Sequence, residues 1–467
     1  MSLNHEQTDR RAERPLDRRT RESGTQQIYD LVCVGFGTTA LSVASSLADS
    51  SPQARILFVE RESQFTWNPE HILPDAPIGS NFLRDLTTTQ NPRSEFTFVN
   101  FLQKTDQLIR FTNNSRMAPT RRLMAQYFKW AADRIKQRGW LSYSQEAVQV
   151  KPVKISVSNR VTQWTLDLRN SKSGALSTVQ SKRIILATGA EPHIMAPLAG
   201  PQLEPLVLHS SGCTGLLERL GSLKQTLNVA IVGADQEAVE IFNHLHTARG
   251  KHTASLFYAD SALRPEDHTA NISDMINRPG SNDSVPPEIR SKLQSVEVHH
   301  SPKVDLDILE SLYEAQYTQK IHEADASKWR FQMRPLSEVV AAKREGNRVR
   351  LVTRNNRTGE VGTTATAFDV IISATGYEHS ANMKLVSPVA PLLDAGALTV
   401  DREYKVNFRR DTISRGCGMW LLGSLEDLKE RGDSFGLMAE RARRTVQSVQ
   451  SSLKEKSDEQ YSEAALL

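Results

Sequence analysis

Two short glycine-containing turns, one near residue 35 and the other near residue 233, constrain what this chain can fold into. The first contains Gly35 and Gly37, follows a short apolar run, and leads into the apolar spacing of a helix that includes Ala40. Gly35 permits a tight turn, and Gly37 lets backbone N–H groups at the helix start approach a pyrophosphate. Glu60 ends the next apolar run about 20 residues later, where a carboxylate can bind a ribose hydroxyl. The sequence therefore predicts a strand–helix–strand unit that binds FAD.

The second turn departs from this pattern, because Asp235 stands where the second glycine is expected. It follows the apolar run 229–232 and includes Gly233 and Gln236. A carboxylate here should repel a pyrophosphate and crowd its approach to the backbone. Two interpretations stay open. In the first, binding of the nicotinamide dinucleotide is weakened or rearranged. In the second, Asp235 has no effect on binding, because the nicotinamide lies away from it or because its carboxylate points to solvent. Two dinucleotide sites in one chain suggest a flavin paired with a nicotinamide.

Composition places the chain among water-soluble globular proteins. It has 467 residues, of which 39% are hydrophobic and 24% charged, and the net charge is only +4. This near balance gives no argument for nucleic-acid binding, and no apolar run reaches the roughly 18–20 residues that cross a bilayer. Cys33, Cys213 and Cys417 are widely spaced, which indicates neither a disulfide framework nor a zinc cluster. We therefore expect a cytoplasmic protein with no membrane partner.

Two buried strands that end in Ala-Thr-Gly, at 187–189 and 374–376, give the order of the domains. The second strand comes after the second glycine turn and echoes the first. We therefore expect the second nucleotide domain to be inserted into the first, with the chain returning after roughly Tyr377. Residues 148–157 and 161–168 alternate as an antiparallel pair in which Pro152 favours an edge position. Residues 65–118 are too irregular to predict a regular layer.

Several separated segments resemble the flavin-dependent N-hydroxylating monooxygenases, the ornithine N5- and lysine N6-hydroxylases of siderophore biosynthesis. The matching segments are 65–68 (FTWN), 82–86 (FLRDL), 91–102 (NPRSEFTFVNFL), 35–37 (GFG), 261–265 (SALRP) and 374–377 (ATGY). The resemblance runs from about residue 29 to about residue 441.

The resemblance implies an α/β fold with two Rossmann-like domains, the NADPH domain inserted into the FAD domain, and a small, mainly helical substrate region. The expected boundaries are a disordered tail over 1–27, FAD domain over 28–205, NADPH domain over 206–365, FAD domain with the substrate-region helices over 366–450, and a flexible tail over 451–467. It also implies hydride transfer from NADPH to FAD and addition of dioxygen to give a C4a-hydroperoxide. An amine nitrogen then attacks the distal oxygen. No protein nucleophile is required, and relatives are commonly homotetramers.

The predicted cofactor-binding residues are Gly35, Gly37, Ala40, Glu60, Trp67, Asn68, Gly233, Gln236, Arg264, Thr375, Gly376 and Tyr377. Gly35, Gly37 and Glu60 are expected to hold FAD. Gly233, Gln236 and Arg264 are expected to hold NADPH, since the family's counterpart of Arg264 contacts the 2′-phosphate.

The chain departs from the family where the amino-acid substrate binds. Gly79 replaces a glutamine that lies beside the flavin, and Arg84 replaces the lysine that meets the substrate carboxylate. Ser273 stands at the position of a substrate-holding asparagine, while Ser434 keeps its identity among new neighbours. We therefore expect Arg84, Ser273 and Ser434 to bind a different amine from free ornithine, one that is larger, peptide-like or modified.

Two alternatives use the same sequence features. The first is a flavin enzyme that oxygenates sulfur or carbon, because the same hydroperoxide serves those reactions. The second is a family member that has lost catalysis and acts as a binding partner, which Asp235 and Gly79 motivate.

Overall fold

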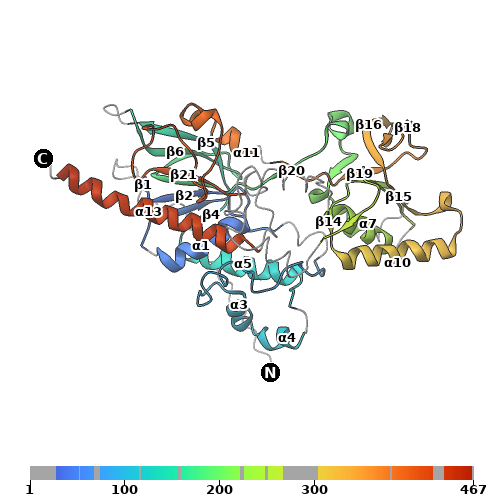
Figure 1. Ribbon diagram of the computed structural model, residues 1–467, viewed down its shortest axis with the longest axis horizontal. Coiled ribbons are helices and arrows are strands. Elements are labelled where there is room, and N and C mark those ends of the chain that lie inside the picture. The colour runs from blue at the N-terminus through green and yellow to red at the C-terminus, as the bar shows by residue number, and fades with distance from the viewer. Residues whose placement is uncertain are drawn as a thin grey trace, which may run out of the picture.

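The computed structural model describes residues 28–51, 53–67, 74–114, 117–154, 159–220, 226–247, 251–266, 303–378, 381–423 and 436–464. Within these residues, two α/β lobes are each built on a five-stranded parallel sheet (Figure 1). The first lobe comprises described residues up to 193 and from 377 onward, and the second lobe comprises those from 194 to 376. The predicted arrangement of two Rossmann-like units in one chain is confirmed.

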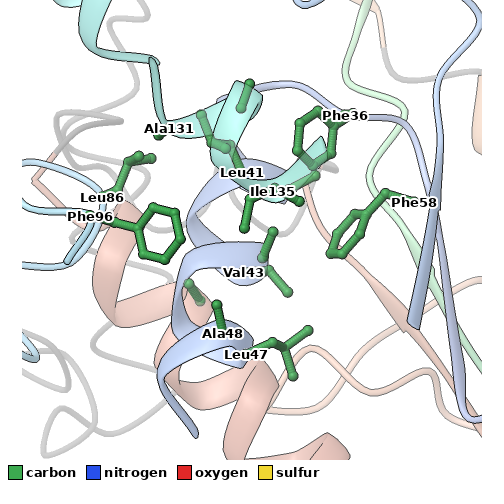
Figure 2. Packing of buried hydrophobic residues seen from close by; sticks show 14 of the residues in the cluster. Phe36, Leu41, Val43, Leu47, Ala48, Phe58, Leu86, Phe96, Ala131 and Ile135 are labelled. Atoms are coloured by element: carbon green, nitrogen blue, oxygen red, sulfur yellow. The ribbon is translucent and has the colours of Figure 1, made fainter. Parts of the chain in front are cut away.

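The sheet of the first lobe contains, in spatial order, β21 (Gly418–Leu421), β8 (Arg183–Leu186), β2 (Leu31–Val34), β3 (Ile56–Val59) and β4 (Leu141–Ser142). One face is covered by α1 (Thr38–Ser50), α5 (Arg121–Gln137) and α13 (Met438–Ala464). Figure 2 shows Leu41 and Val43 of α1 together with Phe58 of β3 and Ile135 of α5 in one apolar cluster. This apolar layer places the start of α1 at the carboxyl ends of the strands.

The other face of this sheet packs against a second, four-stranded sheet. Its strands, in order, are β1 (Ile28–Tyr29), β7 (Leu176–Ser181), β6 (Val161–Asn170) and β5 (Gln145–Lys154). Trp164 of β6 is fully buried between the two sheets, and its Nε1 donates to the carbonyl of Gly418 at 3.1 Å. The expected antiparallel pair is confirmed, and β5, which contains Pro152, lies at the edge of the sheet.

The second lobe has the same design. Its sheet contains, in order, β10 (Val207–His209), β19 (Val370–Ser373), β11 (Asn228–Val232), β12 (Thr253–Phe257) and β15 (Phe331–Arg334). Helices α7 (Gln236–Thr247) and α10 (Leu306–His322) pack on one face, with α6 (Thr214–Leu220) beside them. The antiparallel strands β16 (Ser337–Glu345), β17 (Arg348–Asn355) and β18 (Val361–Thr363) lie beside this sheet, and residues of β16 and β17 pack on its other face. Val229 and Ile231 face the helices, while Ala230 and Val232 face β16 and β17, as the two-residue period of a strand requires.

The chain crosses between the lobes about ten residues away from the boundaries expected at 205/206 and 365/366, and its second crossing lies near the return expected after roughly Tyr377. Strand β19 lies beyond the boundary expected at residue 366 but before the return expected near Tyr377, and it pairs in parallel with β10 and β11. Leu198 and Leu203 were expected in the first domain, yet they pack in the apolar cluster beneath β16. The chain therefore enters the second lobe near residue 194 and leaves its sheet after Ser373.

The segment that was expected to be irregular, 65–118, contains two short helices. They are α3 (Phe98–Lys104) and α4 (Leu108–Asn113). Thr97 caps α3, because its hydroxyl accepts from the N–H of Asn100 at 3.2 Å. Phe98 and Phe101 of α3 join the core of the first lobe, so tertiary packing stabilises helices too short to persist alone.

A two-stranded antiparallel pair, β9 (Glu191–Pro192) with β20 (Tyr377–Glu378), joins the lobes. Thr375 strengthens this connection, since its hydroxyl donates to the carbonyl of His193 at 2.7 Å. After β20 the chain continues into α11 (Ala381–Leu385), which belongs to the first lobe. A further short pair, β13 (Arg264–Pro265) with β14 (Lys303–Val304), lies in the second lobe.

The two Ala-Thr-Gly strand ends have the same structural role in both lobes. Gly35 has φ +90°, and a Cβ atom there would lie 2.3 Å from the carbonyl oxygen of Ala187. Gly233 has φ +146°, and its Cβ would lie 2.1 Å from the carbonyl oxygen of Ala374. In each lobe the first glycine of the turn is therefore required, because a backbone carbonyl occupies the space of a side chain.

Among the described residues, no helix has the length and apolar character needed to span a membrane.

We expect Gly35→Ala to lower the free energy of unfolding by roughly 2–5 kcal/mol, through backbone strain and the clash with Ala187. Gly37→Ala is the matched control, since a Cβ there meets nothing within 4 Å. It should cost at most about 1 kcal/mol, the loss of a preferred capping residue. Urea unfolding of both variants measures the difference. Equal destabilisation would contradict the conclusion that the Ala187 carbonyl requires glycine at position 35.

Candidate functional site

A cavity of about 210 Å³ lies at the first glycine turn, beyond the carboxyl ends of β2, β3 and β8. Ligands of open parallel sheets bind at this edge. Glu60 lines the cavity and also ties the turn to the end of β3. One of its carboxylate oxygens accepts from the N–H of Phe36 at 2.7 Å, and the other accepts from the N–H of Glu62 at 2.9 Å.

The start of α1 has the features of a phosphate site. Gly37 precedes the helix and provides no side-chain cap, and Leu41 N–H makes the first helical bond, to Gly37 O, at 2.9 Å. The N–H groups of the first turn are the ones that a helix leaves without internal partners. Ala40 is fully buried and allows the helix to lie close to the sheet. A pyrophosphate therefore fits at Gly37, with the helix dipole in its favour.

A polar pair behind this cavity supports the same conclusion. The hydroxyl of Thr188, which lines the cavity, donates to Oδ1 of Asn382 at 2.8 Å. Asn382 is buried, and its Nδ2 has no hydrogen-bond partner among the described residues. A buried amide without an acceptor costs free energy unless a bound group satisfies it. The first turn, the cavity and this amide thus fit FAD.

Asp85 organises the loop that carries the predicted substrate residue Arg84. Its carboxylate is buried and accepts hydrogen bonds from the N–H groups of Thr87 (2.9 Å), Thr88 (2.6 Å) and Phe98 (2.6 Å), and from the Thr88 hydroxyl (2.6 Å). Burial raises the pKa of Asp85, and these hydrogen bonds oppose that shift. The half-buried Arg84 is therefore attached to a rigid turn rather than to a loose loop.

The same loop runs alongside the beginning of α5. Ile78 N–H donates to the carbonyl of Pro119 at 2.9 Å, and Phe82 N–H donates to the carbonyl of Met117 at 3.1 Å. Arg121 N–H donates in turn to the carbonyl of Ala76 at 2.9 Å. The candidate substrate segment 76–84 is thus fixed next to the residue that connects the two lobes.

That connection is a bidentate ion pair between Arg121 of α5 and Glu240 of α7. The two guanidinium–carboxylate distances are 2.7 and 2.6 Å, and the Glu240 side chain is fully buried. Gln236 extends the network, since its amide nitrogen donates to Glu240 at 2.6 Å and its oxygen accepts from Asp305 N–H at 2.8 Å. Gln236 was predicted to bind cofactor, and the structure uses both ends of its side chain inside the protein.

Asp235 does not point freely to solvent. Its carboxylate accepts from the N–H of Ala238 at 3.0 Å, so it caps α7. Burial raises the pKa of Asp235 to about 6, and the nearby charges of Glu237 and Glu240 add to the increase, while the hydrogen bond from Ala238 opposes it. The N-terminus of α7 therefore does not offer the open phosphate site that α1 offers.

The predicted residues after β19 lie in the connection between the lobes. Gly376 has φ +80°, and its carbonyl accepts from Nε2 of His209 at 2.9 Å and from His193 N–H at 3.1 Å. The hydroxyl of the partly exposed Tyr377 donates to Glu237 of α7 at 3.1 Å. Burial, followed by the charge of Glu237, raises the pKa of Tyr377.

The remaining predicted residues are more scattered. Arg264 is exposed on β13, where its backbone pairs with Lys303 of β14, and no hydrogen bond or ion pair joins its side chain to another side chain within the described ranges. Trp67 is partly buried, with its ring 5.3 Å from that of Phe128 in the core of the first lobe. Three predictions lie outside the described residues, namely Asn68, Ser273 and Ser434.

Sequence reasoning missed the residues that position the site. Asp85, Arg121 and Glu240 act through long-range hydrogen bonds and ion pairs that no local pattern reveals. One signal was available for Glu240: an acidic residue on the apolar face of the α7 pattern requires a buried partner.

Three comparisons with known proteins agree. A family model described as L-lysine 6-monooxygenase/L-ornithine 5-monooxygenase matches residues 27–379. The chain is 32% identical over 449 residues to an L-ornithine N(5)-monooxygenase of Ajellomyces capsulatus, covering 94% of both proteins. The chain is 27% identical to the ornithine N-hydroxylase KtzI of Kutzneria sp. 744, with a TM-score of 0.79 over 91% of this chain and 99% of that one. The KtzI structure is described as containing reduced FAD, NADP⁺ and L-ornithine. The ornithine hydroxylase PvdA of Pseudomonas aeruginosa shares the fold, with a TM-score of 0.79 and 23% identity over 91% of this chain and 100% of that one.

The raised pKa of Asp235 predicts how stability depends on pH. The carboxyl group binds its proton more tightly in the folded state (about 6) than at its ordinary value of 3.8. Its contribution to the free energy of unfolding therefore falls as pH rises from about 4 to above 6. Asp235→Asn keeps an oxygen for the Ala238 cap and removes the titration. We expect the variant to lose part of the stabilisation that the wild type gains between pH 7.5 and 5, measured by urea unfolding. If the free energy of unfolding depends on pH identically in the wild type and the variant, the raised pKa of Asp235 is contradicted.

Removing the guanidinium from the lobe connection should destabilise the protein. Arg121→Ala leaves the Glu240 carboxylate buried without its cation, which costs roughly 3–5 kcal/mol. The double variant Arg121→Ala/Glu240→Gln removes the unpaired charge and should recover part of the loss. Urea unfolding compares the two, and a double variant as unstable as the single one would show that the buried charge is unimportant.

Proposed function

Because this chain belongs to the L-lysine 6-monooxygenase/L-ornithine 5-monooxygenase family, we propose that it is an FAD-dependent enzyme that N-hydroxylates a primary amine with NADPH as external reductant. The balanced reaction converts the amine, dioxygen, NADPH and a proton into the hydroxylamine, water and NADP⁺. Its curated relative from Ajellomyces capsulatus is named an L-ornithine N(5)-monooxygenase, which supports amine nitrogen over sulfur or carbon as the atom oxidised.

The observation that carries this proposal is the open phosphate site at Gly37, together with a nearby cavity whose lining residue Thr188 bonds to the buried, unsatisfied amide of Asn382. Gly37 leaves the first turn of α1 accessible, and Glu60 holds the turn in place. Nδ2 of Asn382 supplies a donor for the bound group. FAD supplies the redox centre that activates dioxygen when it is bound, and the protein's part is to bind, orient and exclude water.

We assign the carboxylate of the substrate to Arg84. The turn organised by Asp85 fixes the backbone of Arg84, and the hydrogen bonds of segment 76–84 to residues 117–121 place it beside the connection between the lobes. A guanidinium binds a carboxylate through two parallel hydrogen bonds, whereas the lysine of the family pattern offers a point charge. The amine group that is oxidised then lies at the other end of the substrate.

The amine we propose is an amino-acid- or peptide-derived metabolite rather than free ornithine. Gly79 lacks the side chain that the family pattern carries at this position, and Arg84 is longer and forked. Together these changes leave a differently shaped space between the carboxylate-binding group and the flavin. A substrate with substituents on its α-amino group or with a second residue fits such a space better.

The test is a substrate panel with the FAD-loaded enzyme. Free ornithine, free lysine, Nα-acyl-ornithine, short ornithine peptides, a thioether and a ketone are each supplied with NADPH and oxygen, and products are analysed by mass spectrometry. We expect addition of one oxygen atom to an amine, with the substituted compounds preferred over free ornithine. A protein that takes up no flavin, or that oxidises thioethers or ketones instead of amines, would refute the proposal.

Arg84 provides a sharper prediction. Replacing it with Met removes the charge and should raise KM for the preferred amine roughly 10- to 100-fold with little change in kcat, because a charge-assisted hydrogen bond contributes about 1.5–3 kcal/mol. Arg84→Lys retains the charge and should have the smaller effect. Steady-state kinetics measure both constants. An unchanged KM in Arg84→Met would show that Arg84 does not bind the substrate carboxylate.

A further inference from the structure

We propose that Asp235 and Glu237 exclude a dinucleotide pyrophosphate from the N-terminus of α7 and thereby set a low affinity of the second lobe for NADP(H). This inference rests on the proposed function, since it concerns the external reductant of that reaction. Under this proposal, Asp235 and Glu237 determine the affinity for NADP(H). They lie at the Gly233 turn of the second lobe, which is the counterpart of the Gly35 turn at the FAD site.

The contrast between the two helix starts supports the proposal. Both turns place their first glycine against the carbonyl of an Ala-Thr-Gly alanine, so the two backbones are built alike. At α1 the capping residue is Gly37, and no side chain bonds to the first turn. At α7 the carboxylate of Asp235 accepts the Ala238 N–H at 3.0 Å. A phosphate at α7 would have to compete for that donor with an anion that is part of the chain.

Glu237 adds a second fixed negative charge. The Ser210 hydroxyl donates to one carboxylate oxygen of Glu237 at 2.5 Å, and the Tyr377 hydroxyl donates to the other at 3.1 Å. These bonds come from β20 and from the turn after β10, so they hold the side chain at the first turn of α7. The carboxylate cannot swing away without giving up both of them.

Among the described residues, no neighbouring cation neutralises either charge. Arg121 lies near, but its guanidinium is committed to both oxygens of Glu240. In the part of the chain that the structure describes, no ion pair joins Asp235 or Glu237 to a basic side chain. Helix dipoles favour anions by only modest amounts, so two nearby carboxylates outweigh the attraction that this helix end would otherwise offer a phosphate.

A purely structural explanation makes a different prediction. If Asp235 only caps α7, replacing it with Asn should leave dinucleotide affinity unchanged, because Asn is as good a cap as Asp. If its charge repels phosphate, the same substitution should tighten binding. Glu237→Gln is the companion variant, since an amide can retain bonds to Ser210 and Tyr377 without the charge.

The experiment measures binding rather than turnover. NADP⁺ and adenosine 2′-monophosphate are titrated by calorimetry into the FAD-loaded wild type and into Asp235→Asn, Asp235→Gly and Glu237→Gln. NADP⁺ contains the pyrophosphate, whereas the monophosphate contains only the adenosine end. Asp325→Asn is the matched control. Asp325 also caps a short helical turn, where its carboxylate accepts from Ser327 N–H at 3.0 Å. That turn precedes β15, an edge strand of the sheet, and lies away from the start of α7.

We expect the dissociation constant of NADP⁺ to fall roughly 10- to 100-fold in the Asp235 variants and in Glu237→Gln. The affinity for adenosine 2′-monophosphate, and both affinities of Asp325→Asn, should stay within about twofold of wild type. Unchanged NADP⁺ binding in all three variants overturns the proposal, as does an equal change for both ligands. Tighter NADP⁺ binding in an enzyme that oxidises no amine would refute the proposed function and leave this inference standing.

Discussion

Both glycine turns of this protein depend on one contact, in which a backbone carbonyl occupies the space that a side chain of the first glycine would need. The carbonyl of Ala187 lies against Gly35, and that of Ala374 lies against Gly233, so each turn is locked to the strand that ends beside it. This contact fixes where each helix begins relative to the carboxyl edge of its sheet. Gly37 at the start of α1, and the cavity that Gly35 and Glu60 line, are positioned from that contact.

The two lobes then have to be placed relative to each other, and two independent devices do this. One is the short β9–β20 pair with its bonds around His193 and Gly376, which joins the chain where it crosses between the lobes. The other is the buried Arg121–Glu240 pair, which attaches α7 to the beginning of α5. Because α5 also carries the hydrogen bonds of the Arg84 segment, the substrate side of the first lobe and the second lobe share one anchor.

The sequence predicted what depends on local geometry and missed what depends on distant contacts. The first turn and the edge position of Pro152 were predicted because glycine, proline and apolar spacing act over a few residues. The boundary expected at residue 366 leaves β19 outside the second lobe, because the parallel pairing of β19 with β10 and β11 links residues far apart in the chain and no local pattern shows it. Helix α3 was missed because packing and the Asp85 carboxylate stabilise it, and Asp235 proved to be a cap, which neither interpretation had foreseen.

The C-terminal helix α13 has a consequence for how the protein is made. Ala442 and Val449 of α13 complete the apolar layer over α1, and the fully buried guanidinium of Arg183 in β8 bonds to Ser452. Until the ribosome has synthesised α13, the opening sheet therefore lacks one of its covering helices. The second lobe, which lies between residues 194 and 376, is finished earlier and can fold as a unit. Until α13 has emerged, the apolar residues of α1 that it covers stay exposed, so the first lobe completes its core after the second lobe has folded.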